Sequence, residues 1–298
     1  MTCDIVIPVF NNKQTLQLVM DSIAAQAMPS SWGVRVLLCD DGSTDGCIDD
    51  VLRINQRVEV VVLPGQHAGV AAARNRGIEQ SDADVVLFLG ADIILRPGAL
   101  ASHLILHEQN PDTWIGALGL VLWDPRLKPT PLMEWMNHGG PQNNFDALLG
   151  SIYASPSEFF YGSHVSVKRK ALANDVFSEE YTQYGHEDHD LGVRLARRGL
   201  KLRVLHDAIG LHRHFYAADS FFQRQFAVGR GVRIVVRRLG DESLVQVGVL
   251  RLVQYLVYAL GAGALLRYIV RFMSTRWSIP RLFAHSAGYE YRRGVLHR

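Results

Sequence analysis

The segment VRVLLCDDGSTDG (residues 34–46) joins a mostly apolar run directly to a polar turn. A run of Val, Leu and Cys of this length is typical of a strand that is buried on both faces. The Asp-Gly-Ser sequence behind it is ordinary turn chemistry. The segment therefore predicts a buried β-strand whose carboxyl end carries two carboxylates, Asp40 and Asp41.

Three further apolar runs repeat this pattern: DIVIPVF (4–10), VEVVVLP (58–64) and DVVLFLG (84–90). Between the runs, residues 15–27, 46–54 and 70–80 have the spacing of amphipathic helices. Buried strands that are connected through helices imply an α/β fold with a mostly parallel sheet flanked by helices. Because ligands of such sheets bind beyond the carboxyl ends of the strands, we expect the functional site at that edge.

Polar and aromatic residues recur at these predicted strand ends. Pro8 and Phe10 stand at the end of the first strand, Asp40 and Asp41 at the second, and Asp92 at the fourth. An ordinary turn explains any one of them, whereas recurrence at three strand ends indicates a site.

The segment HAGVAAARNRGIEQ (67–80) precedes the fourth strand and combines small residues with two arginines. Small residues allow a helix to approach the sheet closely, and Arg74 and Arg76 either reach an anionic ligand or line a solvated helix face. The chain contains no GxGxxG and no GxxxxGK[ST] sequence. Neither dinucleotide-dehydrogenase nor P-loop chemistry is therefore indicated.

The segment YGHEDHDLGVRLARRG (184–199) crowds three carboxylates and two histidines together. A helix that starts near Asp188 explains part of this pattern, since acidic residues favour a first turn, basic residues a last turn, and Gly199 a helix stop. On that interpretation Asp190 caps the helix. It does not explain why a glycine, two histidines and a further acid, Glu187, precede it, so a functional role competes with the structural one.

Composition limits the class of protein. The chain has 298 residues, of which 48% are hydrophobic and 20% charged, as in an ordinary folded protein with a sizeable core. Its three cysteines, Cys3, Cys39 and Cys47, have neither disulfide-framework nor zinc-site spacing. The N-terminus runs straight into a strand-like segment without signal-peptide features. We therefore expect a cytoplasmic protein.

The C-terminal quarter differs from the rest in charge. Residues 224–298 contain 13 arginines and 3 acidic residues, and the arginines alternate with apolar stretches. The run LVQVGVLRLVQYLVYAL (244–260) carries a polar stripe on an apolar helix, and RYIVRFMSTRWSIPRLF (267–283) follows it. The pattern favours an interfacial helix on an anionic membrane surface. Packing against the catalytic domain or a homodimer interface remains the alternative.

Taken in order, seven segments resemble glycosyltransferase family 2, whose members have the GT-A fold and invert the anomeric centre. The segments are DIVIPVFNN, LLCDDGSTDG, GVAAARNRGI, VLFLGADI, FYGSHVSVKR, YGHEDHDLGVRLARRG and GLHRHF, and they span about residues 3–215. The resemblance implies a catalytic GT-A domain over residues 1–215, and leaves residues 216–298 as a helical C-terminal extension. It implies transfer of a sugar from a nucleoside-diphosphate sugar, a UDP-sugar first of all.

The resemblance also implies roles for individual residues. Asp188 matches the general base that takes the proton of the acceptor hydroxyl, and Glu187 its neighbour. Arg74 matches a donor-binding arginine. The base pocket and ribose contacts fall on Pro8, Phe10, Asp40 and Asp41.

A divalent cation, Mn²⁺ or Mg²⁺, is implied at Asp92 and His212, with His214 as the alternative in register. The family's Asp-x-Asp motif reads Gly90-Ala91-Asp92 here, so its first acid is missing. Asp41 or solvent would replace the lost contact. This departure keeps open a catalytically silent nucleotide-sugar-binding protein, while nucleotidyl transfer is disfavoured because the first strand lacks a glycine-rich basic turn.

The acceptor is not identified by any residue. Residues 123–151 read as a long functional loop, and His164 stands where the family often has asparagine, which predicts altered acceptor contacts. A lipid-linked acceptor or a cell-envelope glycan is compatible with the C-terminal extension. No nucleic-acid partner is expected.

Overall fold

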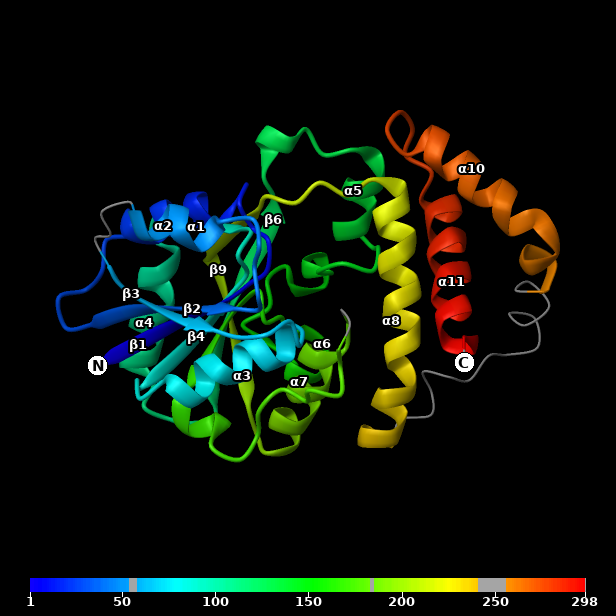
Figure 1. Ribbon diagram of the computed structural model, residues 1–298. Helices are drawn as coiled ribbons and strands as arrows, with labels where there is room; N and C mark the ends of the chain where they lie inside the picture. The colour runs from blue at the N-terminus through cyan, green and yellow to red at the C-terminus, as the bar shows by residue number, and fades with distance from the viewer. Residues whose placement is uncertain (54–57, 183–184, 241–255, 298) are drawn as a thin grey trace. The chain divides into compact units, whose positions relative to one another are not determined.

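The computed structural model describes residues 1–53, 58–182, 185–240 and 256–297, and is shown in Figure 1. Its first four strands are parallel and lie in the order β3-β2-β1-β4. They are β1 (Thr2–Val9), β2 (Gly33–Asp40), β3 (Glu59–Pro64) and β4 (Val85–Leu89). These are the four predicted strands, so the α/β fold is confirmed.

The helices that connect these strands determine where the sheet opens. Figure 1 shows α1 (Leu16–Ala24) and α2 (Cys47–Arg53) on one side of the sheet and α3 (Val70–Gln80) on the other. The chain steps outward from β1 to β3 and returns through α3 to β4, beside β1. Strand order therefore reverses between β1 and β4, which is where sheets of this type bind ligands.

The other half of the sheet is mixed. Strand β8 pairs antiparallel with both β4 and β6, β9 runs parallel to β6, and β5 and β7 pair antiparallel with β9. These strands are β5 (Ile93–Leu95), β6 (Ile115–Trp123), β7 (Tyr153–Ala154), β8 (His164–Lys168) and β9 (Lys201–His212). Helix α4 (Ala99–Gln109) packs on β6 and β9, and α6 (Pro156–Phe159) packs on α7 (Glu187–Arg197).

A cluster of three histidines is buried between α4 and β8. His103 Nδ1 and His107 Nε2 each lie 2.8 Å from Ser166 Oγ, and His164 packs on the ring of His103. Because one hydroxyl has a single proton, at least one of the two imidazoles must donate to it. His164 is fully buried, so the predicted acceptor contact of this residue is wrong.

This cluster predicts that the protein is less stable in acid. Burial holds the pKa of His107 at about 3 and of His164 at about 4, and lowers that of His103 well below its usual range. The unfolded chain takes up these three protons below about pH 6.5, so the free energy of unfolding should fall by up to about 4 kcal/mol per pH unit toward pH 4. Denaturant titrations between pH 7.5 and 4.5 measure this slope.

A matched pair of variants identifies the source of the slope. His164→Asn removes one buried titratable group and should reduce the slope by about one third. His206→Asn changes an exposed histidine on β9 and should leave the slope as it is. Equal slopes in wild type and His164→Asn would contradict the assignment.

A second compact unit is helical. It contains Pro125–Ala147 together with the described residues of 183–186 and 214–298. Trp135 packs there between Phe221 and Phe283, and Glu290 forms ion pairs with Arg267 and Arg293. Its helices are α5 (Pro131–Asn137), α8 (Ala218–Leu239), α10 (Gly263–Met273) and α11 (Pro280–Leu296). Most of the predicted helix over 244–260 lies outside the described residues, which resume at 256.

Candidate active site

The end of β1 carries an aromatic pair. Phe10 is 43% exposed and stacks on His67, with ring centroids 4.1 Å apart and an interplanar angle of 23°. His67 Nδ1 lies 3.0 Å from Asp41 Oδ2, which orients the ring. Pro8 lies within β1, opposite Cys39 of β2. Sequence reasoning missed His67, although its position directly after the third strand is a signal that could have identified it.

The two carboxylates after β2 have different surroundings. Asp41 is 3% exposed and accepts hydrogen bonds from the backbone N–H groups of Ala68 and Gly69, at 3.0 and 2.9 Å. Asp40 accepts from the N–H of Ser43 at 2.9 Å and is only partly buried. Asp41 thus holds the loop that carries His67, while Asp40 is the more exposed of the two carboxylates.

Asp92 and His212 are brought together by strand pairing. Strand β5 pairs with β9 so that Ile93 faces His212, and His212 Nε2 lies 3.2 Å from Asp92 Oδ2. The imidazole stacks on Trp123, with centroids 5.1 Å apart and an angle of 14°. The His214 alternative falls in the helical unit, where it packs on Tyr216. A carboxylate and an imidazole held side by side can supply two ligands to a divalent cation.

Gly90 stands where an acid of the Asp-x-Asp motif is missing. A Cβ atom at this position would lie 2.9 Å from Asp92 Oδ1 and 2.9 Å from Ile93 Cγ1. A side chain at position 90 therefore requires a local shift. The close packing of Asp92 and Ile93 against Gly90 fits a glycine at this position and leaves no room for the acid of the motif without that shift. Within the described part of the chain, no three His, Cys, Asp or Glu side chains are grouped to hold a metal ion by themselves.

Two of the acidic residues at the start of α7, Glu187 and Asp188, bind one arginine. Arg74, on α3, is 5% exposed and donates from Nη1 to Asp188 Oδ1 at 2.7 Å and to Glu187 Oε1 at 3.4 Å. The other Asp188 oxygen accepts from the N–H of Gly162 at 2.8 Å. Both oxygens of Asp188 are thereby oriented.

Solvent exposure separates the three acids. The side chain of Asp188 is 24% exposed, whereas that of Glu187 is 5% exposed. Asp190 is fully buried and lies inside the first turn of α7, where it pairs with Arg194 and accepts from the Tyr181 hydroxyl. The predicted cap role of Asp190 is wrong because the helix begins at Glu187. Asp188 is the acid of the three that a substrate can reach.

The assembled edge can therefore do three things. The Phe10 and His67 pair offers an aromatic surface, Asp92 and His212 offer cation ligands, and Asp188 offers an oriented proton acceptor. Phe10, His67 and Asp92 follow predicted strands and Asp188 stands at the predicted helix start, whereas His212 ends β9, which was not predicted. Arg74 contacts Asp188.

Comparisons with known proteins identify the family of this chain. The family model described as Glycosyl transferase family 2 matches residues 4–174. The chain is 28% identical over 270 residues to the pre-mycofactocin glycosyltransferase of Mycobacterium tuberculosis, with 87% of this chain and 53% of that enzyme covered. This chain thus spans about half the length of that relative.

Solved structures share the fold. A mannosyltransferase, PcManGT from Pyrobaculum calidifontis in complex with GDP-Man and Mn²⁺, matches with a TM-score of 0.65 at 17% identity, covering 99% of this chain and 86% of that one. TarS of S. aureus, residues 1–349 in complex with UDP-GlcNAc, matches with a TM-score of 0.52 at 17% identity, covering 79% and 67%.

Proposed function

This chain belongs to glycosyl transferase family 2 and is a glycosyltransferase of the GT-A fold, and from its site we propose that it inverts the anomeric centre of a nucleoside-diphosphate sugar. The single observation that carries the proposal is Asp188, an accessible carboxylate that Arg74 and a backbone N–H orient at the same sheet edge as Asp92 and His212. We assign the chemistry to residues 1–215.

For the donor we propose a UDP-sugar. The exposed Phe10 ring and its partner His67 offer a stacking surface for the base, and Asp40 has a partly exposed carboxylate for base or ribose. The complexes of PcManGT with GDP-Man and of TarS with UDP-GlcNAc support a nucleoside-diphosphate sugar in general. Asp41 stabilises the loop that carries His67.

We propose that Asp92 and His212 would hold a divalent cation, Mn²⁺ or Mg²⁺. Their 3.2 Å separation and the combination of a hard oxygen with an imidazole fit such an ion. When bound, the ion supplies neutralisation of the charge that develops on the leaving diphosphate. Trp123 stacks on His212 and keeps its imidazole directed at Asp92.

Asp188 acts as the general base. Inversion requires that the acceptor hydroxyl attack from the face opposite the leaving group, with a proton acceptor within hydrogen-bond reach. Arg74 and the Gly162 N–H fix the two Asp188 oxygens, so the carboxylate keeps one orientation without a substrate to hold it. Glu187, bonded to the same guanidinium, supports the position of Arg74.

The metal site gives a direct test of this proposal. A nucleoside diphosphate with Mn²⁺ should raise the melting temperature of the wild-type protein, since a ligand at 100 times its Kd adds about 2.7 kcal/mol of stability. Asp92→Ala and His212→Ala should each lose the part of the increase that depends on Mn²⁺. Differential scanning fluorimetry with a panel of nucleoside diphosphates, with and without Mn²⁺, measures the effect and ranks the bases.

His206→Ala is the matched control, because this exposed histidine lies on the same strand as His212. It should respond to Mn²⁺ as the wild type does. If Asp92→Ala and His212→Ala keep the full Mn²⁺ response, the cation binds elsewhere.

For the acceptor side we propose a lipid-linked or envelope glycan, reached from a peripheral position on the inner face of the cell membrane. No helix in the described ranges combines the length and hydrophobicity of a membrane span. The outer face of α10 and its flanks is apolar, and five of its side chains are 49–89% exposed, namely Leu260, Leu265, Tyr268, Phe272 and Trp277. Arg276 is exposed beside them, and Arg271 is exposed but paired with Asp219, so the face suits anionic lipid chiefly through Arg276.

Vesicle binding tests this membrane proposal. The full chain should co-sediment with vesicles that contain anionic lipid, and the bound fraction should fall as salt rises because the arginine contribution is screened. The double variant Leu265→Ser with Phe272→Ser should lose most of the binding. Leu149→Ser with Ile152→Ser, which changes two exposed apolar residues of the first unit, serves as control.

Two results would contradict the membrane proposal. The first is a wild-type chain that ignores anionic vesicles. The second is a Leu265→Ser, Phe272→Ser variant that binds vesicles normally but changes from dimer to monomer in analytical ultracentrifugation. The second result would make the α10 face a subunit interface.

A further inference from the structure

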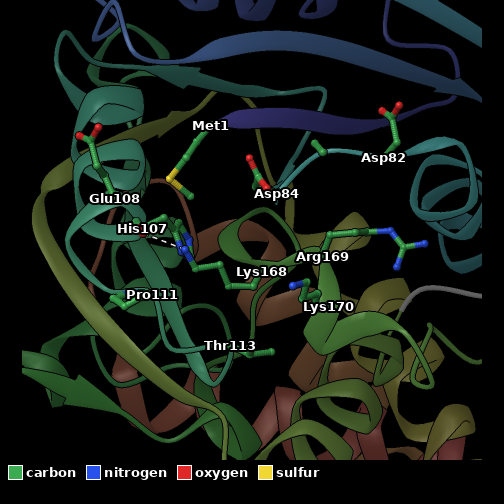
Figure 2. Close-up of a pocket in the computed structure, with 11 residues that line it drawn as sticks. Met1, Asp82, Asp84, His107, Glu108, Pro111, Thr113, Lys168, Arg169 and Lys170 are labelled. Carbon is green, nitrogen blue, oxygen red and sulfur yellow. Dashed lines mark hydrogen bonds between the residues drawn. The ribbon is translucent and has the colours of Figure 1, made fainter.

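A cavity opens at the edge of the sheet opposite the candidate active site. It has a volume of about 440 Å³ and is lined by residues that precede β1 and β4, by the end of α4 and by the residues around the end of β8. Figure 2 shows Asp84 and Lys168 among the lining residues, and they come from neighbouring strand ends, since Val85 pairs with Lys168 and the N–H of Arg169 donates to the carbonyl oxygen of Asp84 at 2.9 Å. The candidate active site lies past the other ends of β1 and β4, about one strand length away, or roughly 17 Å for five residues.

Lys168 is the main feature of this cavity. It is the last residue of β8, is only 7% exposed, and donates to the carbonyl oxygen of His107 at 2.8 Å. Among the described residues no carboxylate lies within ion-pair distance of its ammonium group. Burial lowers the pKa of Lys168. An ammonium has three donors, and enclosing it without a counter-charge is costly unless a ligand supplies one.

Two more cations follow Lys168 in the chain and line the same cavity. Arg169 donates from Nε to the carbonyl oxygen of Ser81 at 3.2 Å, and Lys170 is exposed. Neither side chain forms an ion pair with another residue in the described ranges. The cavity thus gathers three basic side chains that form no ion pair in the described ranges, and the Asp84 carboxylate of the same cavity acts on Lys168 from beyond ion-pair distance.

The acidic residues of the cavity are already engaged. Asp82 forms an ion pair with Arg35 at 2.9 Å. Asp84 accepts from the backbone N–H of Thr2 at 2.9 Å, and Glu108 accepts from a serine hydroxyl at 3.0 Å. A carboxylate has several lone pairs, so Asp84 can also accept from a ligand hydroxyl. The Asp84 carboxylate would repel a ligand whose surface is anionic all round, so the part of the ligand that faces Asp84 must be uncharged.

We propose that this cavity is a second ligand site, which binds a small sugar phosphate with its phosphate on Lys168 and a hydroxyl on Asp84. A phosphate provides the direct ion-pair partner that Lys168 lacks, with Arg169 and Lys170 beside it. The hydroxyl groups of a sugar can donate hydrogen bonds to the Asp84 carboxylate. A volume of about 440 Å³ is in the range of small-molecule sites.

Isothermal titration calorimetry on the full chain tests the site with three probes: glucose 6-phosphate, inorganic phosphate and glucose. Glucose 6-phosphate should bind more tightly than phosphate, and glucose should show no binding. Lys168→Met, which keeps the length of the side chain, should weaken glucose 6-phosphate by about 10- to 100-fold, as expected for loss of a charge-assisted bond. Lys201→Met, which removes an exposed cation outside the cavity lining, should bind as the wild type does.

The Asp92→Ala background separates this site from the candidate active site. Binding of glucose 6-phosphate should persist there, because Asp92 is at the other edge of the sheet. Loss of binding in Asp92→Ala, or wild-type affinity in Lys168→Met, would overturn the proposal. So would equal affinity for glucose 6-phosphate and inorganic phosphate.

A second variant tests the site in case Lys168→Met does not fold. Arg169→Gln with Lys170→Gln changes two side chains that are not fully buried and keeps Lys168 in place. If Lys168→Met does not fold, this double variant decides the question: affinity for glucose 6-phosphate lowered about 10-fold or more supports the site, and unchanged affinity overturns it.

Discussion

Replacing Asp188 with asparagine should lower turnover by about 10²- to 10⁴-fold, the usual contribution of a general base. Asparagine has nearly the same shape but cannot take the proton of the attacking hydroxyl. Release of nucleoside diphosphate, with water as the acceptor, gives the turnover without knowledge of the natural acceptor. Calorimetric titration of the donor in Asp188→Asn should give an affinity close to that of the wild type.

The matched control for this variant is Asp175→Asn. Asp175 accepts from Arg194 and Arg198 at 2.7 and 2.6 Å, so it is also an ion-paired acid, but it lies outside the candidate site. It should keep wild-type turnover. Unchanged turnover in Asp188→Asn would exclude Asp188 as the base and make Glu187 the next candidate. Donor binding without any wild-type turnover would instead favour a silent binding protein.

Gly162→Ala should reduce turnover by about 100-fold or more, although Gly162 carries no reactive group. A Cβ atom there would lie 2.6 Å from both Arg74 Cζ and Asp188 Oδ1. Neither contact is tolerable, and Arg74 has little room to retreat because it is buried over the ring of Phe177. The carboxylate must therefore move, and a displacement of about 1 Å at a reacting group costs about this much.

Gly33→Ala is a suitable control, because its Cβ would meet only Thr2 Cγ2 at an ordinary 3.6 Å. It should retain wild-type turnover and melting temperature. For Gly162→Ala the informative measurements are the turnover and the donor affinity together. Normal turnover would show that the position of Asp188 does not depend on the Arg74 and Gly162 contacts.

The sequence alone was sufficient for the elements that local patterns determine. The four apolar runs became β1 to β4, within one or two residues, because a strand that is buried on both faces needs apolar side chains at successive positions. The same reasoning placed Phe10, Asp41 and Asp92 at strand ends. The acids ahead of Leu191 marked the start of α7, since carboxylates favour the first turn of a helix.

Tertiary structure decided the partner of each of these residues. Asp92 and His212 are 120 residues apart and meet only because β5 pairs with β9 in one register. Arg74 and Asp188 meet across 114 residues, and no periodicity in either segment specifies that contact. Periodicity is set by neighbours in the chain and shows which face of an element is buried. The side chains that face one another depend on strand register and close packing between elements that are distant in sequence.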